Sequence, residues 1–147
     1  MSVDPYVNLE DLFEPIVASF KQTLLNMDKF ERVSEGEELY DLMTQEAWVV
    51  PGRDRIESGG MHMLRHFLEM NVIIFNSEAE SASQPELRKL GEEAYDELMQ
   101  DITHDGSCHW ALPTLFHPGY VQIGGTTVVG ILIQFLCNFE QFYPLPS

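Results

Sequence analysis

The chain has 147 residues, of which 44% are hydrophobic and 22% charged, and this length and composition fit one globular domain rather than a disordered chain. Twenty-four acidic residues against eight basic ones give a formal net charge of −16, which excludes a basic nucleic-acid-binding surface and disfavours anionic membranes. Because no apolar run reaches about 18 residues and Met1–Glu10 lacks an apolar signal region, we expect neither a membrane span nor a secretion signal.

The cysteine content indicates a reducing compartment. Cys108 and Cys137 are the only two cysteines, whereas small secreted domains usually carry more. Cys137 also lies inside an apolar run that is typical of a strand. We therefore expect two buried or half-buried thiols, with a disulfide between them as the open alternative.

The first predicted element is an amphipathic helix from about Asn8 to Met27. Asn8 is a suitable N-cap residue. Pro15 removes a backbone donor within this segment, so the helix either bends there or begins near Phe13. The apolar positions recur at steps of three and four residues, as one face of a helix requires: Leu9, Leu12, Phe13, Ile16, Val17, Phe20 and Leu24.

Strands are predicted over residues 29–34 and 46–50, followed by a loop and a longer strand. The polar segment Arg53–Gly60 ends in consecutive glycines, which predicts a flexible loop. Residues 61–76 alternate between apolar and polar side chains and predict a half-buried strand. Its core-facing positions are expected to be Leu64, Leu68, Met70, Val72 and Ile74.

The second helix is the clearest signal in the chain. Ser77–Gln84 predicts a polar loop, and the sequence Ser83-Gln84-Pro85-Glu86 has the form of a capping box with proline in the first turn. The helix is expected to end near His104-Asp105-Gly106, where a glycine can stop it. Its apolar stripe comprises Leu87, Leu90, Gly91, Ala94, Tyr95, Leu98, Met99 and Ile102.

The last segment, 107–147, predicts a hairpin. A loop that begins near Trp110 and contains Pro113 and Pro118 is followed by a strand at Tyr120–Ile123. A turn at Gly124-Gly125 then leads to a long strand over Thr126–Phe142. The odd-numbered residues of that strand should face the core: Val129, Ile131, Ile133, Phe135, Cys137 and Phe139. The whole order predicts a single α+β domain over 1–147, with an antiparallel sheet of about four strands packed against two helices.

No residue pattern in the chain predicts catalysis. His104, Cys108, His109 and His117 could supply metal ligands, but their spacing is not that of a zinc site. A nucleophilic Cys108 would need an electropositive neighbourhood, and this one has no lysine or arginine. His62 and His66 would lie about 13 Å apart on one face of a strand, too far to share a metal. We expect no catalytic residue, no metal and no cofactor.

Interaction surfaces are the remaining candidates. Exposed strand edges can pair with a neighbouring chain. The C-terminal tail, residues 142–147, is apolar and rich in proline, and it either docks onto a partner or covers its own core.

The element order resembles that of the tail-terminator proteins of long-tailed bacteriophages, also called tail-completion or minor tail proteins. The resembling parts are the helix Leu9–Leu25, the strand that ends in Val72-Ile73-Ile74-Phe75, the helix Leu87–Ile102 and a closing hairpin whose last strand is Val129–Glu140. The resemblance covers nearly the whole chain as a pattern of elements. It departs from the family at Pro15 and in the weak first hairpin between Phe30 and Val50.

The resemblance implies a structural virion protein of the tail and neck, assembled in the host cytoplasm. Such proteins form a ring, typically of six copies, that caps the tail tube and joins it to the head-side connector or neck protein. The genome passes through the ring without specific binding. A ring of six copies would carry six times −16, or −96, and an acidic lumen would repel the DNA backbone. The candidate contacts with other subunits or with the tube are Arg53, Asp54, Arg55, Ile56, Phe142, Tyr143 and Leu145.

Two other function classes stay open. The acidity alone would fit a DNA-mimic inhibitor of a host nucleic-acid-binding protein, although a mimic needs rows of carboxylates and the last 42 residues, 106–147, hold only Glu140. A small enzyme would require the loop from His104 to His117 to bind a metal.

Overall fold

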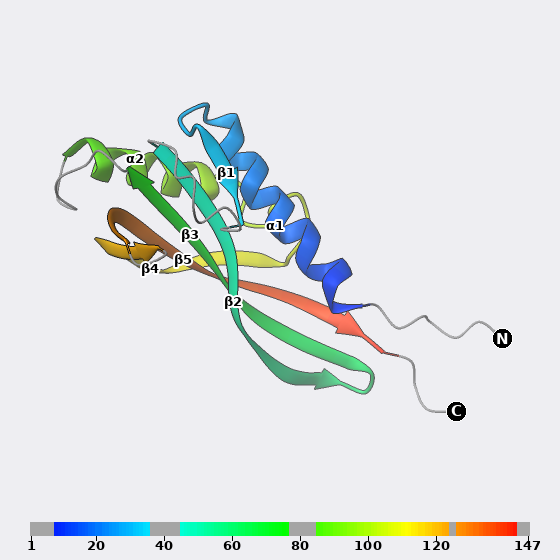
Figure 1. Ribbon diagram of the computed structural model, residues 1–147. Helices are drawn as coiled ribbons and strands as arrows, with labels where there is room; N and C mark the ends of the chain where they lie inside the picture. Colours follow the sequence, from blue (N-terminus) through cyan, green and yellow to red (C-terminus); the bar gives the residue numbers. More distant parts are fainter. Residues whose placement is uncertain (1–7, 36–44, 77–84, 124–125, 144–147) are drawn as a thin grey trace.

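The computed structural model describes residues 8–35, 45–76, 85–123 and 126–143 (Figure 1). Its elements are α1 (Leu9–Asn26), β1 (Arg32–Ser34), β2 (Gln45–Gly60), β3 (Met63–Asn76), α2 (Pro85–Leu98), β4 (Trp110–Ile123) and β5 (Thr126–Phe142). They form a five-stranded sheet in the order β1-β2-β3-β5-β4 with two helices. The α+β class is confirmed. The sheet differs from the expected four antiparallel strands because the short β1 adds to β2 in parallel, and all other pairs are antiparallel.

Both helices pack on the same face of the sheet and enclose the core (Figure 1). α1 contributes Ile16, Val17, Phe20 and Leu24, and α2 contributes Leu87, Leu90, Ala94 and Leu98. Gly91 lets α2 approach β5, because a Cβ at this position would lie 2.6 Å from Ile131 Cδ1. The odd-numbered residues expected to face the core on β5 are all buried, as are Leu68, Met70, Val72 and Ile74 on β3, whereas Leu64 is only half-buried. On the opposite face of the sheet, Trp48, Phe75 and Val128 form a smaller buried cluster.

α1 begins at Leu9 and runs through Pro15. The late start near Phe13 is therefore not adopted. Asn8 precedes the helix in an extended conformation without a side-chain capping bond. Pro15 is exposed, so the Asp11 carbonyl that loses its helical partner lies on the solvent side, where water can satisfy it.

The prediction of a loop at Arg53–Gly60 is wrong. This segment is the outer half of β2 and pairs with β3 from Asp54↔Leu68 to Gly60↔Met63. It lacks the alternation of a half-buried strand because both of its faces are largely exposed. The turn of this hairpin is Met61–His62, so β3 begins two residues later than predicted.

The boundaries of α2 and β4 also differ from the prediction. α2 ends at Leu98 rather than near residue 104, and the Asp101 carboxylate accepts hydrogen bonds from the backbone N–H groups of Thr103 and Asp105. These bonds satisfy the backbone in a turn and so compete with continuation of the helix. β4 begins at Trp110 and includes Pro113 and Pro118, where a loop was predicted. It can hold both prolines because it is an edge strand with a bulge between Pro113 and Leu115.

Several predictions lie outside the described residues: the loop at 77–84 with the Ser83 capping box, the Gly124-Gly125 turn, and the tail beyond Tyr143 with Leu145. Among the helices that are described, neither α1 nor α2 is apolar enough over enough length to cross a membrane.

Candidate functional site

Six of the seven predicted interface residues lie together on one projection of the sheet. We call this projection the arm and define it as residues 53–68 and 137–143. Arg53, Asp54, Arg55 and Ile56 lie on β2, and Phe142 pairs with Met63 across β3 and β5. The Tyr143 backbone N–H donates to the His62 carbonyl at 3.0 Å, which fixes the residue that follows β5 to the hairpin turn. Figure 1 shows the β2–β3 hairpin extending beyond the helices.

The arm differs from the rest of the chain in charge. Three of the eight basic residues lie in it, Arg53, Arg55 and Arg65, and they are matched by three acidic residues, Asp54, Glu57 and Glu140. The arm is therefore neutral overall, and the full net charge of −16 falls on the remainder of the chain. Arg55 contacts Glu57 at 2.7 Å and lies 4.5 Å from the centre of the Phe67 ring. Arg53, by contrast, is exposed and makes no ion pair or hydrogen bond with any described residue.

A fully buried histidine holds the three strands of the arm together. His66 Nδ1 lies 2.6 Å from Asp54 Oδ2 on β2, and His66 Nε2 lies 2.9 Å from Gln141 Oε1 on β5. The ring also stacks on Phe139, with 4.7 Å between centroids and an interplanar angle of 5°. Through its two ring nitrogens His66 bonds to the Asp54 carboxylate and to the Gln141 amide, and these bonds hold the two neighbouring strands in register with β3.

The strand position of His66 was predicted from the sequence, but its two partners were not. Its partners are 12 and 75 positions away in the chain, so no local motif links them. One signal was present, because His66 falls on the same alternating positions as Leu64 and Leu68. An ionisable residue in a core-facing series usually has a hydrogen-bonding partner, so this position predicts a polar partner on a neighbouring strand.

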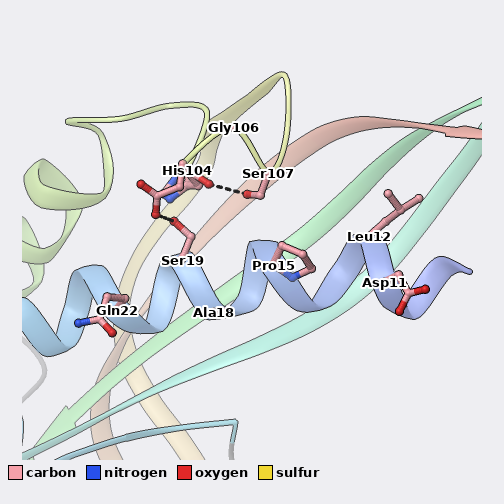
Figure 2. A pocket seen from close by; sticks show the side chains of 10 residues that line it. Asp11, Leu12, Pro15, Ala18, Ser19, Gln22, His104, Gly106 and Ser107 are labelled. Atoms are coloured by element: carbon pink, nitrogen blue, oxygen red, sulfur yellow. Dashed lines mark hydrogen bonds between the residues drawn. The ribbon is translucent and has the colours of Figure 1, made fainter. Parts of the chain in front are cut away.

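A second feature is a cleft of about 610 Å³ between α1 and the turn that follows α2 (Figure 2). Ser19 Oγ donates to Asp105 Oδ2 at 3.0 Å and links the two walls. Within the turn, Ser107 Oγ donates to the His104 carbonyl at 2.6 Å. The lining is Asp11, Leu12, Pro15, Ala18, Ser19, Gln22, His104, Asp105, Gly106 and Ser107.

The turn beside this cleft is strained. His104, Asp105 and Gly106 have φ angles of 46°, 61° and 76°, so two residues other than glycine adopt the left-handed conformation in succession. Such conformations cost about 1–3 kcal/mol each and persist only where surrounding contacts impose them. Here Asp101 fixes the backbone, and hydrogen bonds from the Asp105 N–H, the Thr103 hydroxyl and the Thr103 N–H lower the pKa of its carboxyl.

His104 is buried and stacks on Phe20, with ring centroids 4.0 Å apart. Its Nε2 is buried without a hydrogen-bonding partner among the described residues. Burial lowers the pKa of His104, while the nearby Asp101 and Asp105 carboxylates act in the opposite direction with smaller effect. The ring is therefore neutral at neutral pH.

The pKa of His104 predicts how stability depends on pH. The usual histidine pKa is 6.5, and the folded value is lower, so below pH 6.5 the unfolded chain binds a proton more readily than the folded chain. The free energy of unfolding should fall as the pH drops from 6.5 towards the folded pKa, and His104 should contribute no pH dependence above 6.5. His104 can be replaced with Asn, which tolerates a left-handed backbone. In this variant the free energy of unfolding, measured with urea, should depend less steeply on pH between pH 6.5 and about 5. An unchanged slope would contradict this assignment.

The candidate metal ligands are not brought together. His104 and Cys108 are buried on the helix side of the sheet, whereas His109 is exposed and lies 3.5 Å from Glu140. His117 pairs with Leu132 on the helix-free face. The part of the chain that the structure describes contains no group of three or more His, Cys, Asp or Glu side chains arranged to hold a metal.

Both cysteines are free and buried, as expected. Cys108 Sγ lies 3.5 Å from the Thr103 carbonyl, to which it donates. The contact with Cys108 and its own burial raise the pKa of Cys137, so this thiol stays protonated. A protonated, buried thiol is a core side chain rather than a nucleophile.

Comparison of the chain with protein-family models and with curated proteins gives no match.

Proposed function

We propose that the chain is a structural virion protein that forms a ring, of six copies in the simplest case, at the head-proximal end of a bacteriophage tail tube. The ring would stop tube growth and join the tail to the head-side connector, while the genome passes through it. The observation that carries the proposal is the arm, which gathers residues from the middle and the end of the chain on one projection. A neutral projection on an acidic body suits contacts between subunits or with the tube.

The charge of the body supports the same role. Outside the arm, acidic residues exceed basic ones by 16, so a closed ring would present a strongly negative potential to DNA. DNA is itself a dense line of negative charge and would not adhere to such a surface. A passage that does not retain the genome is what a connection between head and tail requires.

The test is the native mass of the purified chain, alone and with a candidate tail-tube protein. We expect a ring in at least one of the two conditions, near six times 16.8 kDa, about 101 kDa. Electron microscopy should then show the ring at one end of assembled tubes. A monomer in both conditions would contradict the proposal, and a monomer that captures a DNA-binding host protein would favour the DNA-mimic alternative.

A matched pair of variants tests the part played by the arm. Ile56 on the arm is 51% exposed and Leu25 on α1 is 49% exposed, so both can be replaced by Asp without disturbing the core. Ile56→Asp should reduce ring or tube-capped assembly at least tenfold, whereas Leu25→Asp should leave it unchanged. Equal behaviour of the two variants would exclude the arm as the assembly surface.

A further inference from the structure

The cleft between α1 and the turn at residues 101–107 has the chemistry of a receptor for a cationic side chain. It carries carboxylates at Asp11 and Asp105, and none of its ten lining residues is Lys or Arg. Ser19, Gln22 and Ser107 add neutral hydrogen-bonding groups. Leu12, Pro15 and Ala18 provide an apolar wall along about two turns of α1 (Figure 2).

A second observation also points to a ligand at this place. The buried ring of His104 lines this cleft and a second one on the other side of the Ser19–Asp105 bridge, and its Nε2 has no partner among the described residues. A buried polar atom without a partner costs free energy. Together with the strained backbone from His104 to Gly106, it marks this turn as a place where the fold gives up stability, as binding sites often do.

The chain itself offers a cation of the right kind. Arg53 is exposed and has no partner among the described residues, whereas Arg55 is already held by Glu57 and Phe67. Arg53 lies at the irregularity between Pro51 and Asp54, on a part of β2 whose outer side pairs with no strand among the described residues. Bulges of this kind re-aim side chains away from the regular strand direction.

We propose that Arg53 on the arm of one copy docks into the cleft of a second copy. The guanidinium would bond to the Asp11 and Asp105 carboxylates, because its planar fork matches a carboxylate in two hydrogen bonds. Its aliphatic stem would lie along Leu12 and Pro15. Since arm and cleft are different surfaces, the contact runs head to tail and can be repeated around a ring. The proposal deepens the proposed ring function and depends on it for its biological role.

The experiment is a charge exchange, read as native mass and sedimentation in the condition in which the wild-type chain assembles. Arg53→Asp reverses the charge of the docking side chain. Asp11→Arg reverses the charge of one cleft carboxylate, at an exposed position of α1. Each variant alone should associate at least tenfold more weakly than wild type. A mixture of the two should regain association in alternating order, because the wild-type contact forms at one junction and the exchanged charges face each other at the next. The double variant should regain self-association.

Arg88→Asp is the matched control, since Arg88 is equally exposed but lies on α2. If Arg53→Asp associates no more weakly than Arg88→Asp, or if the mixture stays monomeric, the arm–cleft contact is overturned. If the ring still caps tubes in the Arg53→Asp variant, this inference fails and the proposed function stands. If the charge exchange behaves as expected but no ring caps a tube, the contact stands and the proposed function fails.

Discussion

Replacing His66 with Ala should lower the free energy of unfolding by about 2–4 kcal/mol. The substitution removes the partner that Asp54 Oδ2 contacts at 2.6 Å, and the other oxygen, Oδ1, is already buried without a partner among the described residues. It also removes the contact with Gln141 and leaves a cavity beside Phe139. The uncompensated carboxylate should dominate the loss, because burying a polar group without a partner costs more than its bond contributes.

Urea unfolding of His66→Ala, of Asp54→Ala and of the double variant Asp54→Ala/His66→Ala measures this effect. The double variant should lose less than the sum of the two single losses, because the second substitution removes the carboxylate that the first one left unpaired. Arg65→Ala is the control, since Arg65 is exposed on the same strand and should change stability by less than about 0.5 kcal/mol. A His66→Ala variant as stable as Arg65→Ala would show that the histidine does not hold the arm.

Replacing Phe20 with Ala should cost about 3–5 kcal/mol. Phe20 is fully buried and connects three elements: it lies on α1, stacks on His104 in the turn, and meets Phe135 of β5 edge-on at 5.4 Å between centroids. The cavity would open at the junction of these elements, where neither the helix nor the strained turn can close it without breaking other contacts.

Two measurements separate this effect from a general loss of packing. Phe20→Leu keeps most of the volume and should cost clearly less than Phe20→Ala in urea unfolding. In Phe20→Ala, amide hydrogen exchange at residues 103–108 should speed up more than exchange at β3, because the turn loses the ring on which His104 rests. Uniform acceleration across the chain, or a cost below about 1 kcal/mol, would contradict the assigned role.

The sequence predicted best those elements in which buried and exposed side chains alternate regularly. The limits of β5 and its core-facing series were recovered because every second residue from Val129 to Phe139 is buried against the helices. The outer half of β2 was missed because a strand with solvent on both sides imposes no apolar period on its residues. The part of β4 before Tyr120 was missed because its prolines are excluded from central strands but accepted at an edge.

The candidate site was predicted in part. The candidate interface residues Arg53–Ile56 and Phe142–Tyr143 were predicted separately, and the structure places them on the same projection because β3 lies between the two strands that carry them. The pair formed by His66 and Asp54, and the cleft beside His104, depend on contacts between positions far apart in the chain. Such contacts follow from the sheet order and the placement of the helices, which the local residue pattern of a single sequence does not reveal.

The two borders of the sheet bear on how copies of the chain can meet. An unpaired strand invites a neighbour to extend the sheet, and proteins commonly guard against this with proline, charge and irregular register. Both borders here carry such guards: Pro51 and the neighbouring bulge on β2, and Pro113 and Pro118 on β4. Growth of a continuous sheet from chain to chain is therefore impeded on both sides. An assembly of this protein would be joined by side chains, and it would come apart again under high salt in a way that a cross-β fibre does not.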